Sequence, residues 1–298
     1  MKICQQTGQE QLQRLKVGVD LQMPLNYMRN SEGNRKNCAS ILNNSYRKLA
    51  LYACFIEQDL DTMRQYAYFS AKSNILFLQC HPNDGNWLFP LFEVLLSDNA
   101  ELLHWHSQHV LPVYNTHQKW INRNRVGTTE FQAFQDLLAA QQKFDLLGER
   151  AEYILANPPG RTMKRFQTDN AFYLALAKGN KTEMESALQT LCSLKVAQNR
   201  NGADGIIGSE HFMSAAAFYY GKLARLAGYE LDVDMPLYPA HLIAVNPLAD
   251  YTRGEVDVLA EVDIYQTFDG EFAPFTPKPQ GEYNLDITLN SKPMEKLP

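Results

Sequence analysis

The residues best suited to chemistry are three histidines within a run of six residues, His104, His106 and His109. On a helix His106 and His109 share a face, and Glu101 lies one turn from His104, so these side chains have the types that bind metal ions. The run lacks the His-Glu-x-x-His pattern, which supplies two metal ligands and a general base. We therefore interpret them as histidines of a helix surface or helix end and expect no metal site.

Other candidate catalytic groups are isolated. His81 lies near Asp84, and His211 follows Glu210, but each pair would act as acid and base only if the fold placed a substrate between its members. The chain has no Gly-x-Ser-x-Gly elbow, no phosphate-binding glycine loop and no dinucleotide fingerprint, and the turn at 201–205 lacks the distal glutamate of an EF-hand. We expect a protein that is not an enzyme, with no catalytic residue and no cofactor.

The composition predicts an ordinary globular protein. Of its 298 residues 45% are hydrophobic and 20% are charged. Residues 1–10 lack the apolar core of a signal peptide, and no apolar stretch approaches the roughly 18 residues that span a membrane. Five scattered cysteines form no Cys-x-x-Cys pair and indicate neither a disulfide framework nor a zinc site. We expect a cytoplasmic protein without a membrane partner.

The charge balance bears on partners. A net charge of −5 argues against nucleic acid as a ligand, because phosphate binding needs a concentrated basic surface. Basic residues do cluster around 29–36, 119–125 and 161–165, but each cluster is short. We interpret them as solvated loops and helix ends.

Hydrophobic residues at intervals of three and four predict helices along most of the chain. The first two, 37–58 and 60–78, are joined by a short link and should form an antiparallel hairpin. A helix after Trp87, another at 100–109 and a long one from Thr128 or Thr129 through Leu147 follow. These segments predict a core built from helical hairpins.

The stretch 171–241 has strong helix start and stop signals. A helix ends at Gly179, and Asn180 caps the next, whose apolar stripe runs from Met184 to Leu194. A polar turn is expected at 199–208, and a further helix at 209–226. Prolines then favour extended backbone up to 239.

The fold class that follows is all-α, an irregular array of antiparallel helical hairpins with a short extended or β C-terminal segment. No fixed repeat period is present, which argues against a regular solenoid. Residues 1–249 are expected to form the helical domain, with a subdivision near 157–160 left open by the Asn-Pro-Pro-Gly sequence there. Residues 250–298 form the extended segment, because hydrophobic and acidic residues alternate from Val256 to Ile264.

Two blocks carry a family resemblance. The order of helix, Lys-Gly-Asn turn, helix, Gly/Asp turn and aromatic helix across 171–243 resembles the C-terminal half of the immunity protein 49 family. The run Gly85-Asn86-Trp87, followed by an aliphatic helix and an acidic turn at 97–98, resembles that family's entry to a helix. Together the likeness covers most of residues 40–243, and it includes no catalytic motif.

The resemblance implies an immunity protein of a bacterial polymorphic toxin system, which acts in interbacterial competition. Such a protein binds a cognate toxin domain and blocks its active site. A nuclease toxin has a basic substrate groove, which an acidic surface would attract. The acidic residues expected to form the partner-binding surface are Asp232, Asp234, Asp250, Asp257, Glu261 and Asp263.

Two alternatives stay open. A helical-repeat adaptor for protein–protein interaction, without a toxin partner, would show a regular concave groove. A metal-dependent hydrolase that uses the histidines at 104–109 would hold bound metal.

Overall fold

The computed structural model describes residues 5–30, 32–80, 91–108, 129–158, 160–203, 206, 208–251 and 259. Within these ranges the regular secondary structure is helical and no strand occurs, which confirms the all-α class. The predicted C-terminal strand at 256–264 lies, apart from Leu259, outside the described residues. No helix in the described part is both long and apolar enough to cross a membrane.

The α-helices of the described residues are α1 (Gln5–Val17), α2 (Gln22–Arg29), α3 (Arg35–Tyr52), α4 (Leu60–Cys80), α5 (Phe92–Ser97), α6 (Ala100–Gln108), α7 (Thr129–Ala140), α8 (Phe144–Ala156), α9 (Gln167–Ala177), α10 (Lys181–Cys192), α11 (Leu194–Ala203), α12 (Ala215–Leu226) and α13 (Ala240–Ile243).

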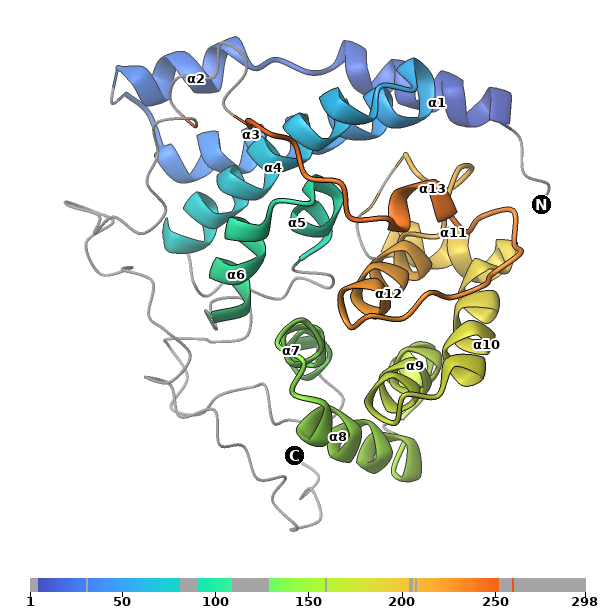
Figure 1. Cartoon of the computed structure of the whole chain (residues 1–298). Helices are drawn as coiled ribbons and strands as arrows, with labels where there is room; N and C mark the ends of the chain where they lie inside the picture. The colour runs from blue at the N-terminus through green and yellow to red at the C-terminus, as the bar shows by residue number, and fades with distance from the viewer. Residues whose placement is uncertain are drawn as a thin grey trace.

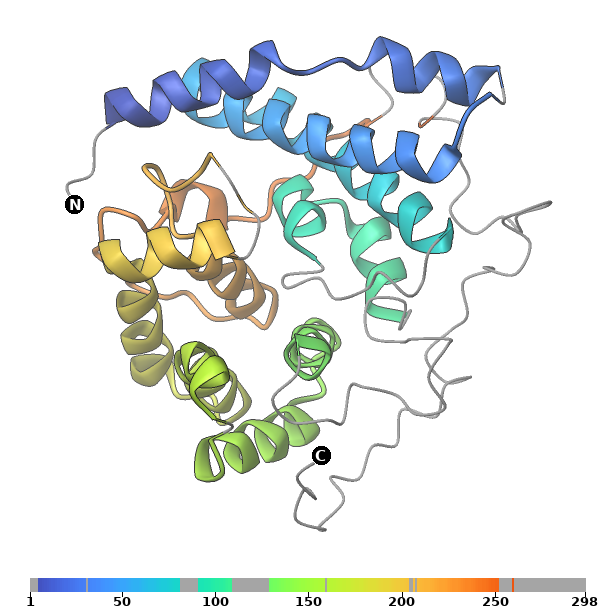
Figure 2. The same cartoon turned by 180° about the vertical axis from the view of Figure 1, so that it is seen from behind.

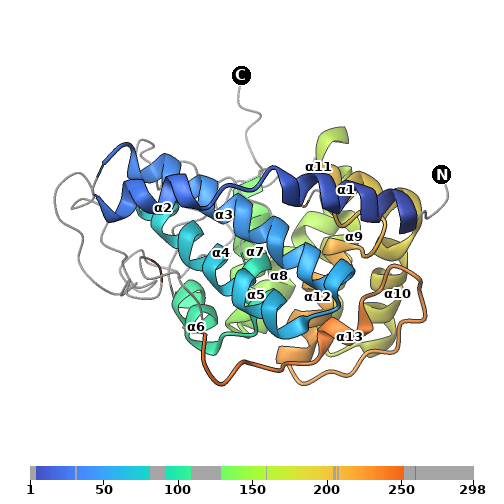
Figure 3. The same cartoon turned by 90° about the horizontal axis from the view of Figure 1, so that it is seen from above.

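The helices are arranged in two groups around a shared centre. Helices α1 to α4 lie together on one side, and α7 to α10 form an arc on the other (Figures 1 and 2). Helices α5 and α12 pack against each other between the two groups, so that α12 is surrounded by other elements. Seen from above, α1 and α2 run across the α3–α4 pair (Figure 3).

Helices α3 and α4 form the predicted antiparallel hairpin, and they share the most extensive helix–helix contact in the described chain. Asn34 caps α3 by accepting the N–H of Asn37. The chain reverses through a π-helical turn at Ala53–Glu57 and through Gln58, whose φ of 55° is left-handed. Asp59 then begins α4 by accepting the N–H and the hydroxyl of Thr62 at 2.9 and 2.7 Å. Both ends of the link are therefore fixed by local hydrogen bonds.

Removal of the Asp59 cap should destabilise the hairpin modestly. The hydrogen bonds from Thr62 hold the pKa of Asp59 below its usual value of 3.8. This contribution is present above that value and is lost as the pH falls through the lower, folded-state pKa. We expect Asp59→Ala to cost about 1 kcal/mol of unfolding free energy at neutral pH. Asp59→Asn keeps an acceptor and should cost less, and urea unfolding of the two variants checks the difference; equal losses would contradict a capping role.

The predicted long helix at 128–147 is wrong, because the chain breaks there into α7 and α8. Gln142 adopts a left-handed φ of 57°, and the N–H of Lys143 donates to Leu138 O at 3.0 Å, as in a Schellman helix end. Glycine usually occupies this left-handed position, so the glutamine gave no stop signal. The Gln142 side chain also donates to Leu226 O at the end of α12. A tertiary contact therefore accompanies a break that local sequence preferences do not indicate.

The predicted turn at 199–208 is also shifted, because α11 continues to Ala203 and α12 begins only at Ala215. Asn201, expected in a turn, is a buried residue of α11. Its side-chain nitrogen Nδ2 donates to Ser209 Oγ and Met213 O, each at 2.8 Å, and its side-chain oxygen Oδ1 accepts the N–H of Ala215 at 3.0 Å. A helix was predicted at 209–214, but these residues form a turn instead. The hydrogen bonds of Asn201 fix the path of this turn between α11 and α12.

One large hydrophobic cluster draws buried residues from α1, α3, α4, α5 and α7 to α13, and a second cluster joins α2 and α6 to α3 and α4. Aromatic residues of α9 and α12 form the centre of the large cluster, and the ring of Phe172 stacks on that of Tyr220 with centroids 4.9 Å apart. The Phe-Tyr-Tyr run at 218–220 is fully buried in this core. Helix α8 ends at Ala156, and beyond the 157–160 segment α9 packs along it.

The buried tyrosines make the fold sensitive to alkaline pH. Burial raises the pKa of Tyr68 and of Tyr238 from 10.0 to about 12. The unfolded chain releases these protons above pH 10 while the folded chain retains them, so their contribution is complete below the unfolded pKa and is lost as the pH rises to the folded pKa. We expect each tyrosine to lower the unfolding free energy by up to about 1.4 kcal/mol per pH unit in this window. Urea unfolding across the window should show a shallower decline for Tyr238→Phe; an unchanged decline would contradict this assignment.

Candidate partner-binding surface

Three of the six acidic residues that were predicted to bind a partner lie in the described part of the chain. Asp232 and Asp234 are exposed on the extended segment between α12 and α13, and Asp250 is exposed near the end of the segment that follows α13. Asp257, Glu261 and Asp263 lie outside the described residues. The structure therefore places Asp232 and Asp234 together on one segment and Asp250 on another.

The segment that carries Asp232 and Asp234 is attached to the core. Val233, between them, is buried, so the extended backbone turns the two carboxylates outward on either side of an apolar anchor. The N–H of Asp232 donates to Glu185 Oε1 of α10 at 2.8 Å. Leu237 is buried further along and accepts the N–H of Ser214 at 2.8 Å. The carboxylates are thus held by a backbone with bonds to two other elements.

The segment at 244–251 is attached in a different way, through Asp98 at the end of α5. Asp98 Oδ2 accepts the N–H of Asn246 at 3.1 Å, and Asp98 Oδ1 lies 2.5 Å from Lys222 Nζ of α12. Lys222 in turn donates to Ala244 O at 2.6 Å. The carboxylate also pairs with Arg64 of α4 at 3.3 Å. One buried carboxylate therefore connects α4, α12 and the segment that leads to Asp250.

Tyr251 provides a second anchor for this segment. Its hydroxyl donates to Ser97 O at 2.6 Å and accepts the N–H of Leu248 at 3.0 Å. Its backbone carbonyl accepts the side-chain amide of Gln65. Asp250 therefore sits directly beside a residue that is fixed to both α4 and α5.

Lys222 is buried, and the loss of solvent lowers its pKa while Asp98 partly opposes that effect. A buried charge of this kind is tolerated only with a well-placed partner. The sequence places Asp98 in an acidic turn and gives no sign of its contact with Lys222. No local signal could have revealed it, because the two residues are far apart in the chain and meet only in the folded protein.

A second buried ion pair joins α9 to α11. Arg200 of α11 donates to both oxygens of Asp169, at 2.7 and 2.8 Å, and the hydroxyl of Tyr220 donates to the same carboxylate. Burial, followed by the charge of Asp169, raises the pKa of Tyr220 well above 10.0, so this hydroxyl stays protonated and continues to donate. The group joins α9, α11 and α12 and lies inside the core, where it supports the scaffold.

The candidate histidines do not converge. His104 is exposed on α6, His106 is buried, and His109 lies outside the described residues. His81 and Asp84 lie outside them as well. Glu210 is engaged in its own turn, where Oε2 accepts the N–H of Gly208 at 2.8 Å. In the part of the chain that the structure describes, no group of three His, Cys, Asp or Glu side chains could hold a metal ion.

Comparison with family models, with curated proteins and with solved structures gave no match for this chain. The resemblance to immunity proteins thus rests on the residues quoted from the sequence. Two of those residues have the predicted local geometry: Gly179 has a φ of 66°, and Asn180 accepts the N–H of Glu183. Gly85, Asn86 and Trp87 lie outside the described residues.

Proposed function

We propose that this chain is an immunity protein that binds a cognate antibacterial toxin domain and occludes its active site. The observation that carries the proposal is the exposure of Asp232, Asp234 and Asp250 on segments that are pinned to a helical core. The resemblance of residues 171–243 to the immunity protein 49 family supports the same function. The buried ionisable groups described above serve the scaffold, which leaves the exposed carboxylates available to a partner.

Pinned carboxylates suit rapid and specific recognition of a basic surface. Negative charge steers a positively charged partner into contact and raises the association rate. Segments that are already ordered lose less conformational freedom on binding, so more of the contact energy appears as affinity. A toxin with a basic substrate groove, such as a nuclease, is the partner that this chemistry favours.

The test is bacterial survival when the toxin domain encoded beside this gene is expressed with or without the chain. We expect the intact chain to restore growth. A variant with Asp232→Asn, Asp234→Asn and Asp250→Asn should lose most of this protection, because the association rate with a basic partner should fall about 10-fold or more.

A matched variant tests whether protection depends on these three acidic residues or on the net charge of the chain. Glu32, Asp145 and Glu149 are also exposed acids, and they lie on other elements, α8 and the loop before α3. The triple variant Glu32→Gln, Asp145→Asn and Glu149→Gln removes the same charge and should protect as well as the unmodified chain. Absence of protection by the soluble, unmodified chain would refute the pairing, and equal losses from both triple variants would refute this surface.

A further inference from the structure

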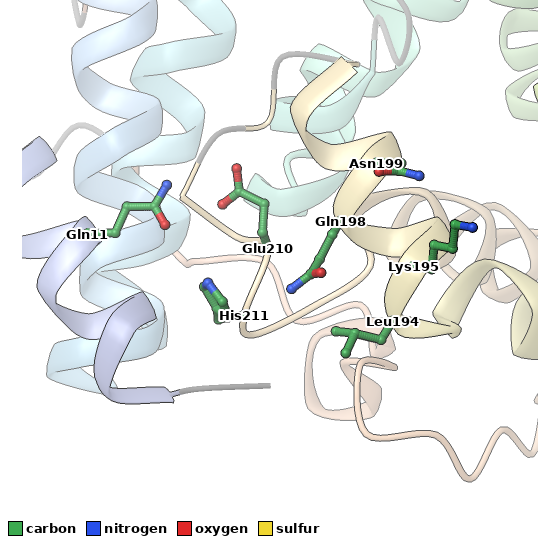
Figure 4. Close-up of a pocket in the computed structure, with 7 residues that line it drawn as sticks. All are labelled: Gln11, Leu194, Lys195, Gln198, Asn199, Glu210 and His211. Atoms are coloured by element: carbon green, nitrogen blue, oxygen red, sulfur yellow. The ribbon is translucent and has the colours of Figure 1, made fainter. Parts of the chain in front are cut away.

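A cavity of about 640 Å³ lies between α1, the first turns of α11 and the turn at 208–214. Figure 4 shows the side chains of Gln11, Gln198, Glu210 and His211 gathered between α1 and α11, and Lys195 at the edge of the cavity on α11, with its ammonium group directed away from them. The volume falls within the range of about 300 to 1,000 Å³ that is typical of small-ligand sites. The cavity is distinct from the acidic segments discussed above.

Two glycines allow the walls of the cavity to approach closely. A Cβ at Gly8 of α1 would lie 2.8 Å from the Cβ of His211 and 2.8 Å from the ring of Phe212. Gly208 has a φ of 101°, and a Cβ there would lie 2.9 Å from the Leu12 side chain. Phe212 stacks on Phe55 with ring centroids 4.7 Å apart, which attaches the turn to the α3–α4 link. The walls of the cavity are therefore held in place by close packing.

The cavity presents polar atoms that the protein itself does not satisfy. Gln198 Nε2 and His211 Nδ1 are both buried atoms without a hydrogen-bond partner in the described protein. Buried polar atoms in folded proteins are nearly always hydrogen-bonded, so two such atoms in one cavity call for a polar occupant. The amide groups of Gln11 and Gln198 each pair a donor with an acceptor, which matches a peptide bond.

The cavity also carries two opposite charges on different walls. Glu210 belongs to the turn, and Lys195 belongs to α11 and is exposed at the rim. Neither residue forms an ion pair with any other described residue. A ligand with one ammonium and one carboxylate end would neutralise both charges.

From these features the geometry points to a binding site for a short zwitterionic peptide, two or three residues long with free ends. Its ammonium group pairs with Glu210, its carboxylate with Lys195, and its peptide bonds with the amides of Gln11 and Gln198. This inference does not depend on toxin binding, because the cavity and the acidic segments share no residue.

Calorimetric titration of the full-length protein with trialanine tests the inference. We expect saturable binding with one site per chain, and binding at least about 10-fold weaker for trialanine that is acetylated at its N-terminus and amidated at its C-terminus, because each lost ion pair to a ligand is worth about a factor of 10. Glu210→Gln, which keeps an acceptor for Gly208, and Lys195→Met should each weaken binding of the free peptide by a similar factor.

Exposed residues away from the cavity provide the controls. Glu149→Gln and Lys143→Met remove the same charges from α8 and the residue that precedes it, and they should bind trialanine as the unmodified protein does. Circular dichroism confirms that each variant is folded before titration. No heat of binding at millimolar trialanine, equal binding of the blocked peptide, or equal effects of cavity and control variants would overturn the inference.

Discussion

Asp169→Ala should lower the free energy of unfolding by about 3 to 5 kcal/mol, the typical cost of leaving one member of a buried ion pair alone. The variant leaves the Arg200 guanidinium, whose side chain is 5% exposed, without the carboxylate that accepts two of its N–H groups. It also removes the acceptor for the Tyr220 hydroxyl at the centre of the aromatic cluster. Urea unfolding at neutral pH measures the loss.

A double variant separates the cost of an orphaned charge from the value of the pair. Asp169→Leu together with Arg200→Met replaces both charges by apolar side chains, which is often neutral or stabilising for buried pairs. We expect this variant to recover most of the stability that Asp169→Ala loses. A double variant as unstable as the single one would contradict the view that the unpaired arginine causes the loss.

Asp98→Ala should cost a similar amount, about 3 to 5 kcal/mol, because it leaves two buried cations without their shared partner. The side chains of Lys222 and Arg64 are 2% and 7% exposed. The variant also removes the acceptor for the N–H of Asn246, so the segment that leads to Asp250 loses an anchor. Urea unfolding reports the stability, and hydrogen exchange should become faster at Asn246 than in the unmodified protein.

The matched control for Asp98 is Asp61, which also pairs with Arg64, at 3.4 Å, but is 82% exposed. Exposed ion pairs contribute little, so Asp61→Ala should cost no more than about 0.5 kcal/mol. If Asp61→Ala and Asp98→Ala lowered the free energy of unfolding by similar amounts, burial would not explain the contribution of Asp98 to stability.

The helices were largely predictable wherever local signals determine their ends. Asn180 lies at a helix start and accepts the N–H of Glu183, and Gly179 takes the left-handed conformation that its position after a helix suggested. The hairpin of α3 and α4 was predictable for the same reason, because a short polar link separates two long apolar stripes. These features depend on residues within a few positions of one another.

The errors occurred where tertiary contacts decide the local structure. Gln142 ends α7 in a left-handed conformation and bonds to the end of α12, and Asn201 stays in α11 because its amide serves the turn before α12. Neither contact is visible in a hydrophobic pattern. The spacing of hydrophobic residues therefore predicts neither the end of α7 at Gln142 nor the continuation of α11 through Asn201.

For the proposed partner-binding surface, the sequence predicts which residues are acidic but not how they are held. The acidic character of 232–234 could be read from the sequence, but the anchors that hold this segment and the one at 244–251 could not. Glu185 and Asp98 lie on other elements and reach these segments only in the folded chain. Sequence patterns identify charged residues, whereas their rigid presentation depends on contacts between distant residues.

The most direct measurement is the dissociation constant between the purified chain and the purified toxin domain encoded beside its gene, determined by calorimetry together with the toxin's activity in the same mixture. The proposed function predicts binding at about 1 nM or tighter, equivalent to about −12 kcal/mol, with loss of toxin activity at one chain per toxin. Binding weaker than about 1 μM, or tight binding that leaves the toxin fully active, would contradict it.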